Sequence, residues 1–445
     1  MANSTMQPTI GLRAIPRKDR RTIAGAAIGT MMEYYDYYLY GLASAVVFPA
    51  VFFPGEEPII GMLASFASFA VGFLLRPVGG ILFGYVGDRF GRKMSLMITV
   101  VGMGICTAAM GLIPSAATIG IAAPILLVFF RMLQGLFVGG EMGPAATLVV
   151  EYAPPGRRGL FGALLITGAG VANMVSAGLM GVLGSGSDSF FMTWGWRIPF
   201  LFAGVLAVVA VVLRSKLEES DEFKTYKETI ELGTVKRKNP LKEALRHPKN
   251  TILGLFIGLP QSIAGYVVLT FGLGYMVSQG TKAEVGFFGT MIVGILQIFM
   301  APLWGHLSDK VGRRRFYIIA CIIFVLLLYP AFALFSTEMA VMIWLGMIVG
   351  FVIPGVAMQA TLHTMLTEMF DVESRTTGVN IGYQFSNTLG GGFAPLICTA
   401  LFAAFGNIWP VIIYAAVIAI AGIIATAYAS IRPDTKNAGR LRELD

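Results

Sequence analysis

Long apolar stretches, separated by short polar segments, run through the whole chain. A transmembrane helix needs about 20 apolar residues to cross a hydrocarbon core roughly 30 Å thick. Twelve stretches are long enough, six in each half of the chain. They lie at 23–48, 59–83, 94–113, 122–150, 160–183, 197–214, 252–278, 284–307, 316–336, 340–367, 376–404 and 409–431. The pattern predicts an all-α membrane protein with twelve transmembrane helices.

The two halves repeat a short charged loop. Residues 84–93 read GYVGDRFGRK, and residues 305–314 read GHLSDKVGRR. This repeat predicts two pseudo-symmetric six-helix bundles in series. The expected division is an N-terminal segment (1–22), a first bundle (23–214), a linker (215–250), a second bundle (251–431) and a C-terminal tail (432–445).

Composition and charge support a membrane protein. Hydrophobic residues make up 56% of the chain and charged residues 13%, which is more apolar side chain than a water-soluble globule can bury. Alternate loops hold 29 of the 33 lysines and arginines, so the positive-inside rule places both termini in the cytoplasm. The net charge of +8 therefore has a topological cause and predicts no nucleic-acid partner. Three cysteines, all in apolar stretches, suggest no disulfide framework.

Charged side chains inside the predicted helices are few, and each needs a partner or a purpose because insertion costs about 2.5–3.5 kcal/mol. In the first helix, Glu33 and Asp36 lie three positions apart, and Tyr37 and Tyr40 continue the same helical face. Two acids and two phenols therefore share one stripe.

The fourth predicted helix supplies a possible counter-charge. Arg131, Gln134 and Glu141 fall within a narrow arc of a 3.6-residue helix. We expect Arg131 to pair with a carboxylate of the first helix, and protonation of that acid to break the pair. The candidate proton-coupling residues are thus Glu33, Asp36, Arg131 and Glu141. The alternative is a permanent salt bridge that stabilises the fold, and for Glu141 both interpretations stay open.

The second half offers neutral hydrogen-bonding groups inside its helices. They occur on the eleventh helix at four positions of one face, on the tenth helix at Gln359 and His363, and on the seventh at Gln261 and Tyr266. We expect them to bind substrate, although bonds between helices would also explain them. The candidate substrate-binding residues are Tyr37, Tyr40, Arg131, Gln134, Arg197, Gln261, Gln359, Asn380, Tyr383, Gln384 and Asn387.

The repeated loop is too basic and too close to the membrane surface for a transport site. A gate latch fits better, because an aspartate at a helix end can bond a facing helix end in one conformation and release it in another. A second pair of charges, seven positions apart, is also repeated in the two halves. The candidate gating residues are Asp88, Arg89, Arg92, Glu151, Arg158, Asp309, Arg313, Glu368 and Arg375.

The loop at 84–93 matches in full the pattern Gly-x-x-x-Asp-Arg-x-Gly-Arg-Lys, and in this the chain resembles the major facilitator superfamily. The segments at 32–36, 76–80, 131–141 and 194–200 resemble its metabolite:proton symporter branch, which includes the shikimate, 2-oxoglutarate, citrate and proline/betaine permeases of bacteria. Residues 382–395 look most similar to the shikimate permeases. The resemblance implies two bundles that rock about a central site in the bacterial inner membrane, with Asp36 and Arg131 as the coupling pair.

Two departures narrow the expected function. The tail after 431 is short, whereas osmosensing proline/betaine permeases carry a long coiled-coil extension. The fifth predicted helix, 160–183, lacks the Gly-Pro motif of drug:proton antiporters. Both differences favour uptake of another metabolite.

We therefore expect a monomeric, proton-coupled importer of a small hydroxylated or carboxylated metabolite, such as shikimate or a dicarboxylate. Arg131 or Arg197 would face the carboxylate. The proton is the coupling ion, and no cofactor or metal is expected. Two alternatives stay open: uptake of a zwitterion such as proline or betaine, caged by tyrosines 34, 35, 37 and 38, and a membrane sensor that transports nothing. No nucleophile–base set or phosphate loop indicates an enzyme.

Overall fold

The computed structural model describes residues 17–55, 57–90, 92–139, 149, 153, 156–215, 248–337, 339–370 and 375–430. Side chains are described for these residues except 17–27, 84, 87–90, 92–93, 213–215 and 375–377. The secondary structure of this part of the chain is entirely helical, which confirms the all-α prediction.

The helices of the first half follow one another with short connections. They are α1 (Arg17–Val46), α2 (Phe48–Phe52), α3 (Pro58–Leu74), α4 (Arg76–Phe90), α5 (Arg92–Leu112), α6 (Ala116–Ile119), α7 (Ala122–Val138), α9 (Arg158–Gly184), α10 (Asp188–Phe190), the π-helix η2 (Phe191–Gly195) and α11 (Arg197–Ser215).

Three helices of the second half contain an internal π-helical segment. The elements are α14 (Pro248–Gly265), η3 (Tyr266–Phe271), α15 (Gly272–Ser278), α16 (Ala283–Val311), α17 (Arg313–Phe335), α18 (Ala340–Met347), η4 (Ile348–Val352), α19 (Pro354–Met369), α20 (Arg375–Ser386), η5 (Asn387–Gly392), α21 (Ala394–Phe405) and α22 (Trp409–Tyr428).

Each of the twelve predicted transmembrane helices has a counterpart in the described chain. Ten helices are long and apolar enough to cross a bilayer. The other two are α7, whose described part is a shorter apolar helix, and α1, which carries the acids and basic residues noted above. Several boundaries differ from the prediction by a few residues. The main differences are that the second helix is interrupted at Leu75 and that the sixth begins earlier, at Asp188.

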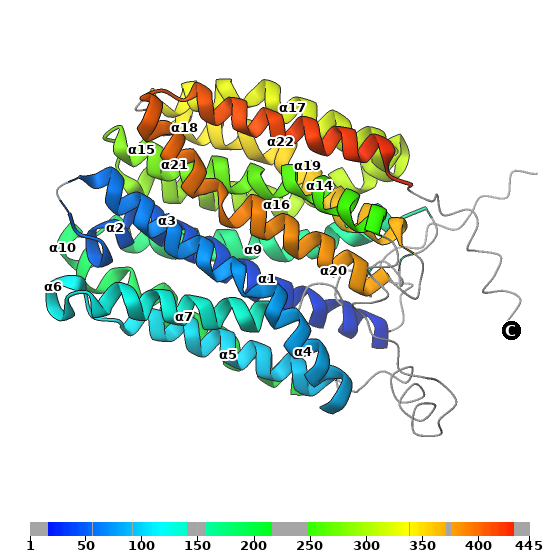
Figure 1. Ribbon diagram of the computed structural model, residues 1–445, viewed down its shortest axis with the longest axis horizontal. Helices are drawn as coiled ribbons and strands as arrows, with labels where there is room; N and C mark the ends of the chain where they lie inside the picture. The colour runs from blue at the N-terminus through cyan, green and yellow to red at the C-terminus, as the bar shows by residue number, and fades with distance from the viewer. Residues whose placement is uncertain are drawn as a thin grey trace, which may run out of the picture.

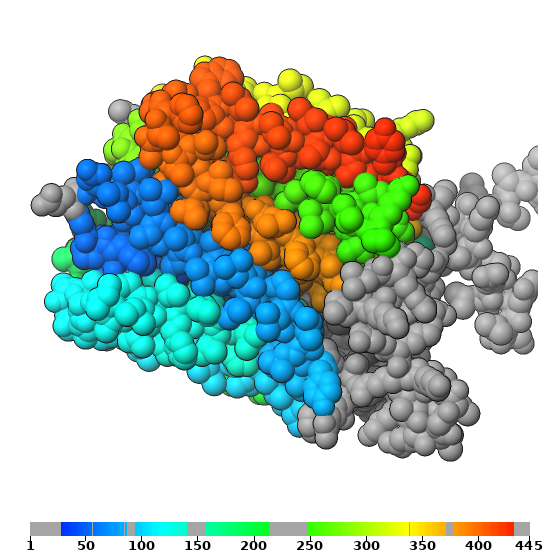
Figure 2. Space-filling model, viewed as in Figure 1, coloured from blue at the N-terminus to red at the C-terminus, as the bar shows by residue number. Residues whose placement is uncertain are grey.

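The long helices run side by side along one axis. In Figure 1 the first half (blue to teal) lies below the second half (green to red), and α1 begins at the end of the bundle where α22 stops. We call this end, which holds Arg17 and Tyr428, the termini-side end, and the other the opposite end. Figure 2 shows the surface of α3 against the orange surface of α20 and α21, which agrees with the contacts between α3 and α21.

The closest packing between the halves joins α9 and α16. A Cβ atom added at Gly294 would lie 2.4 Å from the Met174 nitrogen, and one at Gly305 would lie 2.5 Å from the Gly159 carbonyl oxygen. Glycine is needed at both places because no larger residue permits such an approach.

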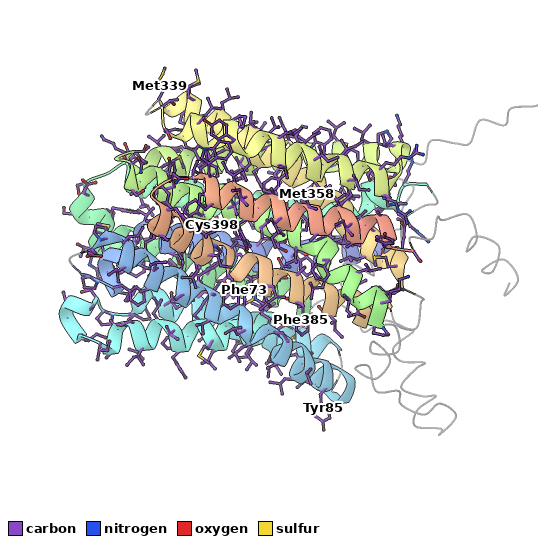
Figure 3. All side chains as sticks on the ribbon, turned by 45° about the horizontal axis from the view of Figure 1, so that its top comes forward. Phe73, Tyr85, Met339, Met358, Phe385 and Cys398 are labelled. Atoms are coloured by element: carbon purple, nitrogen blue, oxygen red, sulfur yellow. The ribbon has the colours of Figure 1, made fainter. Side chains whose placement is uncertain are left out.

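Many large apolar side chains point outward from the bundle, including Phe299 and Leu326, which are 70% and 67% exposed. Figure 3 shows such side chains around the outside of the helices, among them Tyr85 and Met339. An apolar outer surface over helices of this length is what a bilayer requires.

Candidate functional site

A hydrogen-bonded ion pair lies inside the first half, between α1, α5 and α7. Nη1 of Arg131 is 3.4 Å from Oδ2 of Asp36. Oδ1 of Asp36 accepts hydrogen bonds from the Thr107 hydroxyl, at 2.6 Å, and from the Gln134 amide. All four side chains are buried. Three donors, one of them cationic, therefore hold this carboxylate within the membrane region.

The guanidinium of Arg131 is enclosed by groups of the same half. Its Cζ lies 4.0 Å from the ring centroid of Tyr40 and 5.0 Å from that of Phe69. Gln134 accepts a hydrogen bond from Nη1. A Cβ atom at Gly72 would come within 2.5 Å of Nε, so the side chain lies directly against α3. These neighbours of Arg131 all come from the first half.

A second buried arginine, Arg76, begins α4 and is 1% exposed. Its Cζ lies 3.5 Å from the ring centroid of Phe73 and 4.1 Å from that of Tyr37. The Tyr37 hydroxyl in turn donates a hydrogen bond to Glu33. Nε and Nη1 of Arg76 are buried and have no hydrogen-bond partner in the described part of the chain. Cation–π contact supplies part of the stabilisation that these donors lack.

The acidic stripe of α1 is divided between the two arginines. Asp36 forms an ion pair with Arg131. Glu33 accepts a hydrogen bond from the hydroxyl of Tyr37, and the ring of Tyr37 adjoins Arg76. Positions three apart on an α-helix differ in direction by about 60°. This difference is enough to aim the two acids at different neighbours.

Next to the two arginines, side chains of the first half contact side chains of the second half. The hydroxyls of Tyr34 and Tyr383 are 3.0 Å apart, and the Thr388 hydroxyl donates a 3.1 Å hydrogen bond to the carbonyl of Phe73. The rings of Phe73 and Tyr266 meet edge to face with centroids 6.0 Å apart. Phe73 lies about halfway along the bundle (Figure 3). This is the place where transporters built from two repeats bind substrate.

Two hydrogen-bonded pairs occupy the second half at this level. The Ser262 hydroxyl donates to Oδ1 of Asn387 at 3.0 Å. Nε2 of Gln297 donates to Oε1 of Gln359 at 2.9 Å. The pairs bring α14, η5, α16 and α19 together around neutral polar groups.

Other polar groups are buried without a hydrogen-bond partner among the described residues. They include Oε1 of Gln261, both amide atoms of Gln384, Oδ1 of Asn380 and both amide atoms of Asn173. Leaving such a group unsatisfied costs about 1–3 kcal/mol, and native proteins contain few. Unsatisfied amides on α9, α14 and α20 therefore point to a polar ligand or bound water.

Sequence reasoning did not select Arg76, Gln297 or Asn173 as site residues. Each is a polar residue within a long apolar stretch, which is the signal that could have found them. His363, by contrast, packs its ring on Tyr383 with centroids 5.1 Å apart.

Arg197, a candidate for binding the substrate, is used elsewhere. Its Nη1 donates to the carbonyls of Gly111 and Ile113 at 2.8 and 2.7 Å, and its Nε donates to the Thr193 carbonyl at 2.9 Å. It ties α11 to the loop after α5 at the opposite end of the bundle. Because these bonds hold the side chain at the opposite end of the bundle, away from Arg76 and Arg131, we do not retain Arg197 in the candidate substrate site.

Three π-helical segments widen the helices of the second half, and two of them, η3 and η5, contact helices of the first half. Tyr266 begins η3 and Asn387 begins η5, while η4 precedes α19. π-helical turns are rare and often occur at functional sites. Here two of them begin at residues of the candidate site.

A charged contact joins the halves at the termini-side end. The Asp309 carboxylate accepts hydrogen bonds from the backbone N–H groups of Gly159 and Leu160, at 2.8 and 3.0 Å. It thereby caps the N-terminus of α9, where negative charge is favoured. Arg313 binds both Asp309, at 3.0 Å, and Glu368, at 2.9 Å.

The remaining candidate gating residues are only partly described. Thr364 donates a 3.1 Å hydrogen bond to the Arg158 carbonyl, a further link between the halves. Glu368 forms an ion pair with Arg313; the predicted pair of Glu368 with Arg375 involves a side chain outside the described residues and stays a prediction. The side chains that fall outside the described residues are Asp88, Arg89, Arg92, Glu141, Glu151 and Arg375.

No group of three or more His, Cys, Asp or Glu side chains that could hold a metal ion occurs within the described ranges. What the candidate site offers chemically is a carboxylate–guanidinium pair, a second guanidinium and a set of amides and phenols. This arrangement suits reversible binding of a polar solute.

Comparison with known proteins identifies relatives over the whole chain. The family model of the Major Facilitator Superfamily matches residues 26–282 and 261–444. The shikimate transporter of Escherichia coli K12 is 39% identical over 409 residues, covering 91% of this chain and 92% of the relative. The proline/betaine transporter of Salmonella typhimurium LT2 is 34% identical, covering 92% and 82% of the two chains.

Solved structures share the fold. The D-xylose–proton symporter superimposes with a TM-score of 0.69 at 19% identity, covering 94% of this chain and 98% of that one. A partially occluded, inward-open form of the E. coli xylose transporter gives a TM-score of 0.70 at 18% identity, covering 93% and 97%. The twelve helices, the repeated loop and these matches lead to one conclusion: the chain is a multi-pass membrane transporter that belongs to the Major Facilitator Superfamily.

Proposed function

We propose that the protein is a proton-coupled symporter that imports a small organic acid or hydroxylated metabolite by alternating access, with shikimate or a dicarboxylate as leading examples. The observation that carries this proposal is the buried pair of Asp36 and Arg131 beside the interface of the two halves. The names of the relatives, a shikimate transporter and an inner membrane metabolite transport protein, support the substrate class and the membrane.

Charge balance explains how a proton and an anion would move together. Among the described residues, the middle of the bundle holds two acids, Glu33 and Asp36, and two arginines, Arg76 and Arg131. Protonating either acid leaves one positive charge in excess, which is expensive in a low-dielectric interior. An anionic substrate removes that excess. Proton and substrate therefore favour each other's binding, which is what symport requires.

The gating role proposed for the charged loops follows from Asp309. In the described conformation its carboxylate joins α16 to the first turn of α9, which keeps the halves together at the termini-side end. We place this end in the cytoplasm, together with both termini. We place the linker, which connects the two rocking bundles, on the same side. A monomer with no bound cofactor suffices for this mechanism.

Uptake into proteoliposomes tests the proposal. Purified protein should accumulate radiolabelled shikimate when the outside is acidic, and a protonophore should abolish the accumulation. A panel of hydroxylated acids and dicarboxylates extends the search if shikimate is not taken up. Accumulation that persists at full rate after the proton gradient has collapsed would contradict proton coupling.

A second candidate function, uptake of proline or betaine, is favoured by relatives that carry those names. The tyrosines that could cage a quaternary amine are largely occupied, however. Arg76 covers the ring of Tyr37, and the Tyr35 hydroxyl bonds the Pro199 carbonyl within the first half. Competition by betaine and not by carboxylic acids would favour this alternative.

A further inference from the structure

We propose that Arg76 binds the carboxylate of the transported substrate, and that the substrate is a hydroxylated monocarboxylate. This inference deepens the proposed function and rests on it. It assigns the anion to a residue that sequence reasoning passed over in favour of Arg131 and Arg197.

Arg76 is a buried cation that forms no direct salt bridge among the described residues. It is 1% exposed, and no acidic side chain within the described residues lies at ion-pair distance from it. Its Nε and Nη1 have no acceptor in the part of the chain that the structure describes. The rings of Phe73 and Tyr37 cover the guanidinium, but they do not accept from these N–H groups in the way that an oxygen does. A carboxylate would supply both charge and hydrogen-bond acceptors, in the forked geometry that arginine prefers.

The other two arginines are already engaged. Arg131 is bonded to Asp36 and Gln134, and Arg197 donates to three backbone carbonyls. Nε and Nη2 of Arg131, like Nε and Nη1 of Arg76, have no hydrogen-bond partner among the described residues. A substrate carboxylate at Arg131, however, would lie beside the carboxylate of Asp36, which already neutralises the guanidinium. At Arg76 no carboxylate within the described residues forms such a salt bridge.

The position of Arg76 also suits a ligand that must contact both halves. Phe69 and Phe73, on the preceding turns, touch Tyr266 of the second half. On the following turn, a Cβ atom at Gly80 would lie 3.8 Å from Nδ2 of Asn380. Because the guanidinium of Arg76 lies on the ring of Phe73, which itself touches Tyr266, Arg76 is placed beside the second half.

The groups around Arg76 indicate one carboxylate and a neutral, hydroxyl-bearing body. The nearby amide of Asn380 and both polar atoms of Gln384 have unsatisfied hydrogen-bonding capacity, and neutral amides suit hydroxyl groups. A second carboxylate would find no free cation here among the described residues, because Arg131 is paired. Dicarboxylates should therefore bind more weakly than hydroxylated monocarboxylates.

Matched ligands and variants test the assignment. Dissociation constants are measured by calorimetry at one pH for shikimate, its methyl ester and succinate, or for the tightest hydroxylated acid of a panel and its ester. In the wild type we expect the acid to bind on the order of 100-fold more tightly than the ester. In Arg76→Gln the acid should lose this advantage, while the affinity of the ester changes less than about threefold.

Two further variants and three contradicting outcomes keep the test decisive. Arg76→Lys keeps the charge without the forked geometry and should retain about a tenth of the preference for the acid; it decides the question if Arg76→Gln fails to fold. Arg197→Gln, the matched control, should leave the acid-to-ester ratio unchanged. An unchanged ratio in both Arg76 variants would overturn the assignment, and tighter binding of succinate would overturn the substrate class. A wild type that binds none of the acids would instead overturn the proposed function.

Discussion

Asp36 accepts two hydrogen bonds from neutral donors and forms one ion pair with a cation. Thr107 and Gln134 donate to Oδ1, and Arg131 approaches Oδ2. Protonation at Oδ2 would weaken the ion pair and leave the bonds to Oδ1 in place. The residue is thus built to lose one contact on taking a proton, which is the property that a coupling site needs.

Asp36→Asn should uncouple transport from the proton. Asparagine presents the same Oδ1 acceptor to Thr107 and Gln134, so the local structure is retained, but it cannot exchange a proton. We expect accumulation driven by a pH gradient to fall to the level of protonophore-treated wild type, while exchange of labelled for unlabelled substrate continues. Arg131 loses its counter-charge, so the free energy of unfolding should fall by about 3 kcal/mol, as measured by thermal melting.

Asp188→Asn, at the surface of the opposite end, is the control for removing one acid and should transport normally. Proton-driven accumulation at wild-type rate in Asp36→Asn would show that another acid is the coupling group.

At the residue scale, sequence reasoning identified the acids and arginines but not all of their partners. A buried charge can be predicted from the sequence because the charged residue stands within a long apolar stretch. Whether Arg197 meets a ligand or the carbonyl ends of a neighbouring loop depends on tertiary contacts, which spacing along the chain does not contain. The different partners of Glu33 and Asp36 likewise depend on tertiary contacts and could not be read from the sequence.

Among the elements, the N-terminus of α9 has an unusual cap. Its own cap residue, Arg157, makes no side-chain capping bond, and Asp309 of α16 supplies the acceptors from the other half. A helix cap supplied by another element lasts only while the two elements stay together. The contact therefore links local helix stability to the relative position of the two halves.

Asp309→Asn should loosen the first turn of α9. The amide leaves one of the two backbone N–H groups without an acceptor and removes the charge that favours the helix N-terminus. With a loss of about 1 kcal/mol, hydrogen exchange at Gly159 and Leu160 should rise about fivefold. Glu284→Gln, at the other end of α16, is the matched control and should leave this exchange unchanged. Equal exchange in Asp309→Asn and wild type would mean that the contact does not hold α9.

The long helices could be predicted because twenty consecutive apolar residues have few other stable states than a membrane span. The interruption at Leu75 and the π-helical segments could not. Such features depend on how neighbouring helices and side chains satisfy the displaced backbone groups, and Asn387 or Tyr266 carries no local signal for them.

For the whole molecule, contacts between the halves occur at both ends and in the middle. Asp309 joins them at the termini-side end, and Tyr34 and Tyr383 meet in the middle. Towards the opposite end, Gly41 of α1 lies against Thr270 of η3. A Cβ atom added at Gly41 would be 3.0 Å from the threonine hydroxyl. In the proposed cycle these contacts cannot all persist, because each side must open in turn.

A disulfide between positions 41 and 270 should stop transport. A Cβ at Gly41 would lie 3.9 Å from that of Thr270, close to the mean of about 3.8 Å for disulfides. The double variant Gly41→Cys and Thr270→Cys, made after replacing the three buried native cysteines, should lose uptake on oxidation and regain it on reduction. The matched pair Gly204→Cys and Ala108→Cys, with 3.4 Å between Cβ positions, joins two helices of the first half and should transport in either state. If the oxidised 41–270 bridge forms and uptake continues, these helices do not separate during transport, and the opposite end must open elsewhere.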